Sequence, residues 1–460
     1  MTRTVKDMLT VLDYLAVPDS TTREDFWKLQ QYVEVPQVPR PKSFLECIDK
    51  AKGSLHGIRI AIPKMFIGKH DPKAQPIAIN QDIIDLWRQA RQDLEALGAT
   101  VVETDFPLVT NYEDESVSGK ANNVIGFEPD WNGKERGELV AYLWDDFLRT
   151  SGDPKFADGL GSVDGSQMFP RPANYVPDRY MEHRNFMDYP GLVAIAKNRN
   201  GKSIWDIDGI AEALPALEAQ RKRDFEDWMD TQGIDIVVFP SAGDVGRSDV
   251  DTNDASAKHA LQNGVRYSIG NRAIRHMGIP TVSVTMGPMK NPHMPVNLTF
   301  AGKHGQDTDL LINAYEFEQR TRRRFAPPVT PILDSDRLDG SYNNGESDTK
   351  SSVSQLRIGE IFVEKTSPSM IQLKGSVHGV QSSEVTVEVY VDGKQVPGSE
   401  ISFKGGSLRL RASFVQFDPP KPLYGGVGQV VGNINIIILA RCGRQTAGQL
   451  IQLPQRDTEG

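Results

Sequence analysis

The spacing of apolar residues changes once along the chain, close to residue 355, and this change predicts two kinds of fold. Before it, short apolar runs that end at proline alternate with helical patterns. Residues 58–63 form one such run, and residues 81–97 carry apolar side chains at helical spacing. After residue 355, apolar and polar residues alternate, most clearly over residues 385–391. We therefore expect helices that cover a largely parallel sheet, followed by an all-β, sandwich-like domain.

The length of the chain agrees with this division. A chain of 460 residues is too long for one compact core, since domains cluster near roughly 100 to 200 residues. We expect an α/β region over residues 1–328, a linker over residues 329–354 and the β domain over residues 355–455. The linker is rich in Asp, Ser, Gly and Asn, and its aspartates do not have the spacing of a calcium loop.

Composition argues against several classes of partner. The 52 Lys and Arg against 61 Asp and Glu give a formal net charge of -9, which does not favour a nucleic-acid partner. Cys47 and Cys442 lie far apart and form no metal-spaced cluster, so we expect neither a disulfide framework nor a zinc site. No cofactor is expected either. No apolar run reaches the roughly 18 residues of a membrane span, and the chain opens on a helical pattern instead of a signal peptide. These features favour a cytoplasmic protein without a membrane partner.

The first helix is expected over residues 4–15, where Thr4 and Asp7 have the spacing of a capping box. Its apolar stripe has no partner upstream, so we expect its packing surface to be missing. Asn80 is the expected N-cap of helix 81–97, and Asp307 that of a later helix. The remaining helices are expected over residues 138–148, 211–229 and 265–276, and the strands over residues 58–62, 100–103, 233–240, 281–285, 296–300, 356–363, 370–373, 385–391, 401–403, 408–414 and 434–439.

Four segments, in the same order, resemble the amidase signature family. They are the Met-Thr-Arg-Thr-Val-Lys-Asp-Met-Leu run at residues 1–9, the strand and helix over residues 57–99, the run Ile-Asp-Ile-Val-Val-Phe-Pro at residues 234–240, and a last part made of residues 278–284 and the helix over residues 307–318. The resemblance implies part of a mixed-sheet fold and a hydrolase of carboxamides. It also implies a Ser-Ser-Lys triad, in which a desolvated lysine takes the proton of a serine.

The triad of the family belongs upstream of the segment that residues 1–9 resemble. No Gly/Ser-rich nucleophile loop occurs over residues 1–328, and Gly405-Gly406-Ser407 is better explained as a hairpin turn. We therefore expect no catalytic residue in this chain. Its ancestor would act on a small amide, and this shortened version would be inactive on its own.

Two residues are candidates for substrate binding. Ser241 and Asp244 follow the strand that ends at Pro240, at the edge where α/β folds hold ligands. Ser241 lacks a G-x-S-x-G elbow, so it is expected to line a pocket rather than to attack a substrate. Surface or capping roles are expected for the four histidines that follow, none of which has metal spacing: His259, His276, His293 and His304.

A non-catalytic alternative is a binding or assembly module derived from an amidase. Half of a shared sheet would leave an open edge, and an open edge invites self-association.

Overall fold

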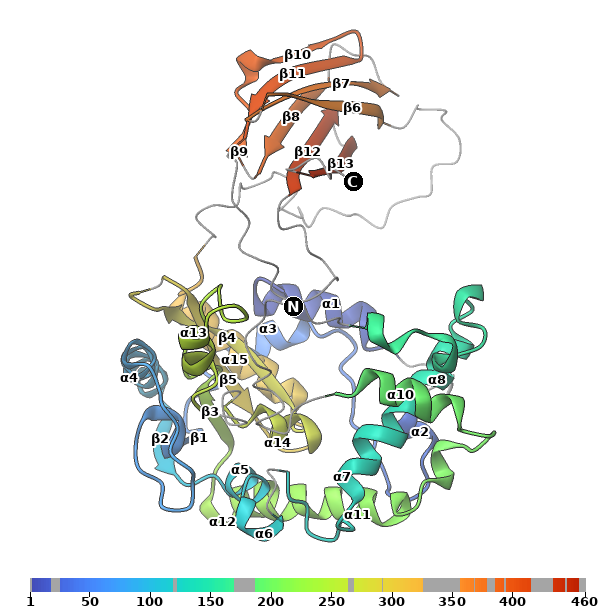
Figure 1. Ribbon diagram of the computed structural model, residues 1–460. Helices are drawn as coiled ribbons and strands as arrows, with labels where there is room; N and C mark the ends of the chain where they lie inside the picture. The colour runs from blue at the N-terminus through green and yellow to red at the C-terminus, as the bar shows by residue number, and fades with distance from the viewer. Residues whose placement is uncertain are drawn as a thin grey trace. The chain divides into compact units, whose positions relative to one another are not determined.

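The computed structural model (Figure 1) describes most of the chain. The described residues are 2–17, 25–118, 122–168, 187–263, 269–291, 293–325, 356–367, 369–378, 385–392, 394–414, 433–442 and 445–454. The expected linker at residues 329–354 therefore lies outside them. The chain divides into two compact units, Met1–Arg324 and Phe325–Gly460. No helix among the described residues is both long and apolar enough to cross a membrane.

The first unit is built on a five-stranded mixed sheet in the order β2-β1-β3-β5-β4. β1 pairs in parallel with β2 and β3, whereas β5 runs antiparallel to both of its neighbours. The expected mixed sheet is thus confirmed, with its antiparallel part at the β4 end. The strands are β1 (Arg59–Pro63), β2 (Thr100–Thr104), β3 (Ile236–Pro240), β4 (Thr281–Pro288) and β5 (Pro295–Ala301).

Helices bury the apolar face of this sheet. α4 (Gln81–Ala96) begins where expected, because the Asn80 side chain accepts the backbone N–H of Asp82. α15 (Asp307–Thr321) packs Phe317 against Phe300 of β5, with ring centroids 5.8 Å apart. Other elements of this unit are α1 (Val5–Leu15), α2 (Phe26–Leu29), α3 (Glu46–Ala51), the turn Lys64–Ile67, α5 (Pro107–Tyr112), α6 (Glu115–Ser118), α12 (Asp227–Gln232), α13 (Asp254–Ala260) and α14 (Asn271–His276).

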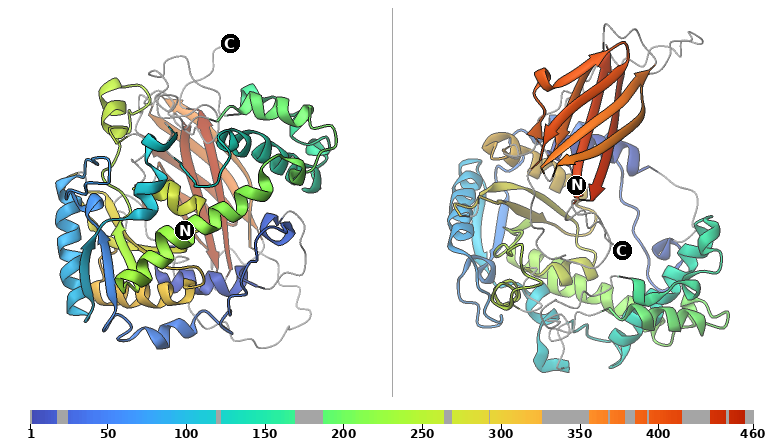
Figure 2. Two further views of the ribbon diagram at one scale, coloured as in Figure 1. Left: turned by 90° about the horizontal axis from the view of Figure 1, so that it is seen from below. Right: turned by 45° about the horizontal axis from the view of Figure 1, so that its top comes forward.

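A second cluster of helices has its own apolar core. Its elements are α7 (Trp131–Lys134), a π-helical turn (Glu135–Leu139), α8 (Val140–Thr150), 3₁₀ turns at Pro154–Phe156, Leu160–Ser162, Gly165–Gln167 and Ile204–Asp206, α10 (Tyr189–Lys197) and α11 (Ile210–Arg221). In Figures 1 and 2 it lies beside the sheet, joined to it through α11.

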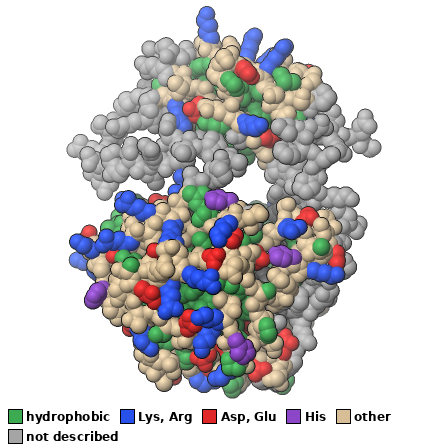
Figure 3. Space-filling model, turned by 90° about the vertical axis from the view of Figure 1, so that its left-hand side faces the viewer, with side chains coloured by type: hydrophobic (Ala, Val, Ile, Leu, Met, Phe, Trp, Pro, Cys, Tyr) green, Lys and Arg blue, Asp and Glu red, His purple; other side chains and the backbone are tan. Residues whose placement is uncertain are grey.

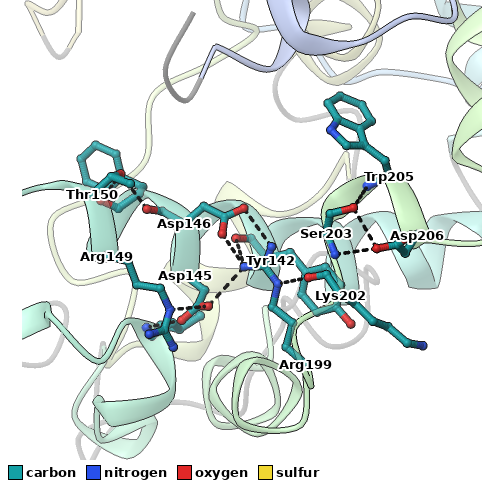
Figure 4. Close-up of polar contacts among 12 residues, drawn as sticks. Tyr142, Asp145, Asp146, Arg149, Thr150, Arg199, Lys202, Ser203, Trp205 and Asp206 are labelled. Carbon is teal, nitrogen blue, oxygen red and sulfur yellow. Dashed lines mark hydrogen bonds and ion pairs between the residues drawn. The ribbon is translucent and has the colours of Figure 1, made fainter.

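Arg199 ties the loop after α10 to α8 (Figure 4). Its guanidinium donates to the carboxylates of Asp145, at 3.2 Å, and Asp146, and it stacks 4.6 Å above the Tyr142 ring. Asp145 is buried and also accepts the backbone N–H of Leu160 at 2.9 Å. Because the carboxylates of Asp145 and Asp146 are both bonded to Arg199, the network holds the loop after α10 against α8.

The second unit contains two four-stranded antiparallel sheets, β10-β11-β7-β6 and β13-β12-β8-β9. Alternate residues of both sheets, among them Leu373, Leu408 and Ile436, form one buried cluster. The view at the right of Figure 2 shows the two layers. The strands are β6 (Arg357–Ser367), β7 (Met370–His378), β8 (Thr386–Val391), β9 (Lys394–Gln395), β10 (Ile401–Lys404), β11 (Ser407–Ser413), β12 (Asn433–Cys442) and β13 (Gln445–Pro454).

Gly405 and Gly406 form the two-residue turn between β10 and β11, as expected. Both have positive φ, 59° and 79°, which glycine adopts without steric cost. The Lys404–Ser407 pair closes the hairpin. The Gly-Gly-Ser run is therefore a turn and not a nucleophile loop.

Three expectations need correction. The apolar stripe of α1 has a partner within the chain, since Val5 and Leu9 are buried in the core that contains α15, although Leu15 is 74% exposed. Asp307 does not cap α15; it is the first residue of that helix. The helix expected over residues 211–229 is interrupted by a π-helical turn at Lys222–Glu226 between α11 and α12.

Candidate functional site

The most distinctive feature near the expected site is a polar face on β3, β5 and β4. Residues that lie directly opposite each other on paired strands point to the same side of a sheet. Thr299 of β5 lies opposite both Phe239 of β3 and Ser283 of β4. Asn297 and Thr285 form the next row. We call this surface the hydroxyl face, and its polar members are Ser241, Thr281, Ser283, Thr285, Asn297 and Thr299.

Ser241 belongs to the hydroxyl face because the pairing of β3 with β5 continues one residue beyond Pro240, the last residue of β3. Its backbone N–H donates to the carbonyl of Asn297 at 2.8 Å. Its hydroxyl is 2.6 Å from that of Thr299, which in turn is 2.9 Å from the hydroxyl of Ser283. Three hydroxyl groups from three strands thus form one hydrogen-bonded chain, with the 7% exposed Thr299 at its centre.

The opposite face of β4 and β5 is apolar, which distinguishes it from the hydroxyl face. Leu298, Phe300 and Val284 alternate with the polar residues and are buried. β4 and β5 therefore each have one apolar side that packs on the core and one more polar side, whereas β3 is buried on both sides.

A cavity of about 550 Å³ opens at the β4 edge of this face. Ser283 and Asn297 line it on the side of the hydroxyl face, and the residues of β4 from Thr281 to Thr285 run along it. Apolar side chains form the opposite wall, among them Met8 and Leu12 of α1. A mostly apolar wall that faces a few polar groups is typical of a small-molecule site.

Glu318 of α15 is the acidic group at the α1 end of the cavity. Its two carboxylate oxygens accept the backbone N–H of Val5 at 3.0 and 3.2 Å. Burial raises the pKa of Glu318 above its ordinary value, and the hydrogen bond from Val5 opposes this shift. The carboxylate occupies the N-terminus of α1, where a negative charge is favourable.

Asp244, the second candidate from the sequence, lies away from the cavity lining and is used within the protein. One carboxylate oxygen accepts from the Asn80 side chain at 3.0 Å and from the Val245 backbone at 2.8 Å. The other lies 3.1 Å from Nε2 of His259. Since Asn80 caps α4, Asp244 holds the loop after β3 against the start of that helix.

These contacts define what Ser241 can do chemically. Among the described residues, its hydroxyl has Thr299 as its hydrogen-bond partner, and no histidine, lysine or carboxylate contacts it. A serine without a proton acceptor is a poor nucleophile. The arrangement can bind a neutral polar group through hydroxyl donors and acceptors.

A second polar cluster was not expected from the sequence. His276 of α14 was expected at the surface or at a cap, but its side chain is only 18% exposed. Its Nδ1 is 2.8 Å from the Tyr112 hydroxyl, and its Nε2 is 2.7 Å from the Glu135 carboxylate. Burial raises the pKa of Tyr112 well above its usual range. These residues lie far apart in sequence and join α5, α14 and the π-helical turn before α8.

No group of His, Cys, Asp or Glu within the described residues could hold a metal ion. No family model and no curated protein matches the chain.

Solved structures match with low similarity. Peptide amidase from Stenotrophomonas maltophilia shares 19% identity over 71% of this chain and 53% of its own, with a TM-score of 0.43. An amidase family protein from Bacillus anthracis shares 15% identity over 71% and 48%, with a TM-score of 0.40. A bacterial aryl acylamidase, described as a member of the amidase signature family, shares 16% over 70% and 52%, with a TM-score of 0.37. The chain spans about half the length of the solved structures it matches.

Proposed function

We propose that the α/β unit is the substrate-holding part of a carbon–nitrogen hydrolase of the amidase signature type, and that the chain by itself does not hydrolyse amides. The observation that carries this proposal is the hydroxyl face, with Thr299 linking Ser241 and Ser283 beside the cavity. The sequence resemblance supports the choice of amide as the substrate class.

A carboxamide fits such a surface because it is uncharged and both donates and accepts hydrogen bonds. Hydroxyl groups can rotate to meet either requirement, and the side-chain amide of Asn297 offers a donor and an acceptor. The hydroxyl face itself carries no charged side chain, while the cavity beside it is also lined by four charged residues: Arg3, Arg40, Asp307 and Glu318. The apolar wall of the cavity would hold the remainder of a small amide.

The lack of hydrolysis follows from the surroundings of Ser241. Its hydroxyl is bonded to another neutral hydroxyl, which does not withdraw its proton. The glycine-rich turn at Gly405 and Gly406, which could have been taken for a nucleophile loop, belongs to the β unit.

Binding and hydrolysis can be tested separately on the full chain. Saturation-transfer NMR with benzamide as the probe should show binding, while ammonia release from the same mixture should stay at the buffer rate. The Thr299→Val variant keeps the volume of the side chain and removes the central hydroxyl, so it should weaken binding by roughly tenfold. Ser166→Ala, in a 3₁₀ turn of the helical cluster, is the matched control and should bind like the parent chain.

Two results would count against the proposal. Benzamide binding that Thr299→Val leaves unchanged would remove the hydroxyl face from the site. Ammonia release that a serine-directed covalent inhibitor abolishes would show that the chain holds an activated serine.

The alternative function is a non-catalytic assembly module, and the position of β4 favours it as a second candidate. β4 is the last strand of its sheet among the described strands, and the cavity runs along it. Near the end of this edge, the guanidinium of Arg323 donates a hydrogen bond to the backbone carbonyl of Met286 at 3.2 Å. Residues Thr281 to Thr285 of the same edge line the cavity instead. An open strand edge can accept a strand from another chain.

Size-exclusion chromatography separates the two functions. Assembly through β4 predicts dimers or larger species that the Thr285→Pro variant dissociates, because proline removes a backbone donor and is tolerated in edge strands. A monomer at all concentrations would leave the substrate-holding function as the better account.

A further inference from the structure

The outer face of the sheet β10-β11-β7-β6 is basic, although the whole chain has a net charge of -9. The strand pattern of β11 is regular: Leu408, Leu410 and Ala412 are buried, and the residues between them are exposed. Four exposed cations share this outer face: Lys374, Lys404, Arg409 and Arg411. We call these residues the basic face. On the side of the α/β unit seen in Figure 3, by contrast, Lys and Arg are interspersed with Asp and Glu.

The basic face places like charges directly beside each other. Arg409 of β11 lies opposite Lys374 of β7, and Arg411 lies opposite Gln372 on the same two strands. Like charges that oppose each other across strands destabilise a sheet by roughly 0.2–1 kcal/mol. An anion bound between Arg409 and Lys374 would attract both cations and so offset the repulsion between them.

None of the four cations has an ion pair or hydrogen bond with another residue in the part of the chain that the structure describes. Two acidic residues accompany the four cations: Glu364 of β6, opposite Gln372 of β7, and Glu400 of the turn before β10, which lines the same depression as Arg409 and Arg411. The local excess of positive charge is therefore not neutralised by the unit itself.

The basic face is also hollowed. A depression of about 490 Å³ lies over β10, β11 and β7 and is lined by Arg409 and Arg411, together with Ser402, Gln372 and one carboxylate, that of Glu400. Hydroxyl and amide groups thus stand beside the two guanidinium groups. Guanidinium groups bind carboxylates in a bidentate manner, and neighbouring neutral donors add to such a site.

We propose that the basic face binds an extended acidic peptide of a partner protein, with carboxylates at every second residue. Arg409 and Arg411 are two residues apart on one strand, so their side chains emerge about 7 Å apart. Alternate side chains of an extended peptide have the same spacing. A peptide that lies along β11 would bring one carboxylate to each arginine and a further one to Lys374 or Lys404.

The surface is less suited to a single-stranded nucleic acid. Such partners need aromatic platforms on which successive bases stack. Phe362 is the exposed aromatic side chain of this face, at 62% exposure, and it lies on β6, two strands away from the arginines.

The experiment is fluorescence anisotropy with the full chain and labelled peptides of about ten residues, a length that spans roughly 30 Å when extended. In the first peptide Glu alternates with Ser, and in the second the same residues are grouped in two blocks. The alternating peptide should bind roughly tenfold more tightly than the block peptide, and a higher salt concentration should weaken its binding. The double variant Arg409→Gln with Arg411→Gln should reduce binding by roughly tenfold or more.

A matched control removes two exposed lysines elsewhere, Lys52→Gln with Lys394→Gln, and should bind like the parent chain. Equal binding of the two peptides, or full binding by the arginine variant, would overturn the proposal. A single-stranded RNA or anionic vesicles of phosphatidylserine that bind more tightly, with the same arginine dependence, would also overturn it by assigning another class of partner.

Discussion

At the scale of single residues, Asp244 shows how a candidate ligand-binding group can instead position the scaffold. Its carboxylate connects Asn80, the Val245 backbone and His259. We predict that Asp244→Ala lowers the free energy of unfolding by about 1–3 kcal/mol, because Asn80 and Val245 lose their acceptor. Urea denaturation measures this change.

Asp244→Asn should lose less stability, since an amide oxygen can still accept the Val245 N–H. Asp158→Ala, at an exposed loop position, is the control and should change little. If Asp244→Ala unfolds at the same urea concentration as the parent, the positioning role is wrong.

The hydroxyl of Tyr112 is the next residue whose role can be measured. It is almost fully buried and has the Nδ1 of His276 as its partner, at 2.8 Å. We predict that Tyr112→Phe costs about 1–2 kcal/mol of stability, because the ring still fills its site while a buried imidazole nitrogen loses its partner. Tyr14→Phe, whose parent side chain is 80% exposed, should be neutral in the same thermal or urea measurement.

The sequence could not reveal these pairings at the residue scale. Tyr112 and His276 are 164 positions apart, and Ser241 and Thr299 are 58 apart, so only the folded strands and helices bring them together. One signal was present for the hydroxyl face: Thr281, Ser283 and Thr285 alternate with valines within a single strand. That pattern identifies a polar face but not its partners on β3 and β5.

At the scale of elements, the contact between α1 and α15 depends on the charge of Glu318. Because burial raises the pKa of Glu318, the folded chain binds this proton more tightly than the unfolded chain. The contribution of Glu318 to stability is therefore greatest when it is protonated. This contribution to stability falls as the pH rises from 4.5, the ordinary pKa of a glutamate, through the raised pKa of Glu318 in the folded state.

We predict that Glu318→Gln, which cannot titrate, removes this part of the pH dependence. Relative to the parent, the variant should gain stability as the pH rises above 4.5, when both are measured by urea denaturation at several pH values. The control is Gln319→Glu, which changes the charge one position further along α15. This variant should not gain stability relative to the parent as the pH rises above 4.5. A parallel pH dependence of Glu318→Gln and the parent would contradict the prediction.

Local signals decided which elements could be predicted from the sequence. α4 was predicted closely because it has a capping asparagine and an amphipathic stripe, and β1 because its alternating isoleucines end at a proline. β13 was missed because its N-terminal half is mostly Gln, Ala and Gly, residues that give little strand signal. The π-helical turns were missed because a one-residue change of helical register leaves the apolar spacing almost unchanged.

At the scale of the whole molecule, the apolar cores belong to one unit or the other. Phe317 is fully buried in the core of the α/β unit, whereas Leu373 and Ile436 are buried in the core shared by the two β sheets. Since each unit has its own core, we propose that the two units unfold independently.

Differential scanning calorimetry of the full chain should then show two transitions, each sensitive to changes in only one unit. Phe317→Ala should lower the transition of the α/β unit, because it removes about 3–5 kcal/mol of core packing. Lys374→Glu should raise the transition of the β unit by roughly 1–5 °C, because it converts the repulsion with Arg409 into an attraction. If both variants shift a single common transition, the two units unfold together and the proposal of independent unfolding is wrong.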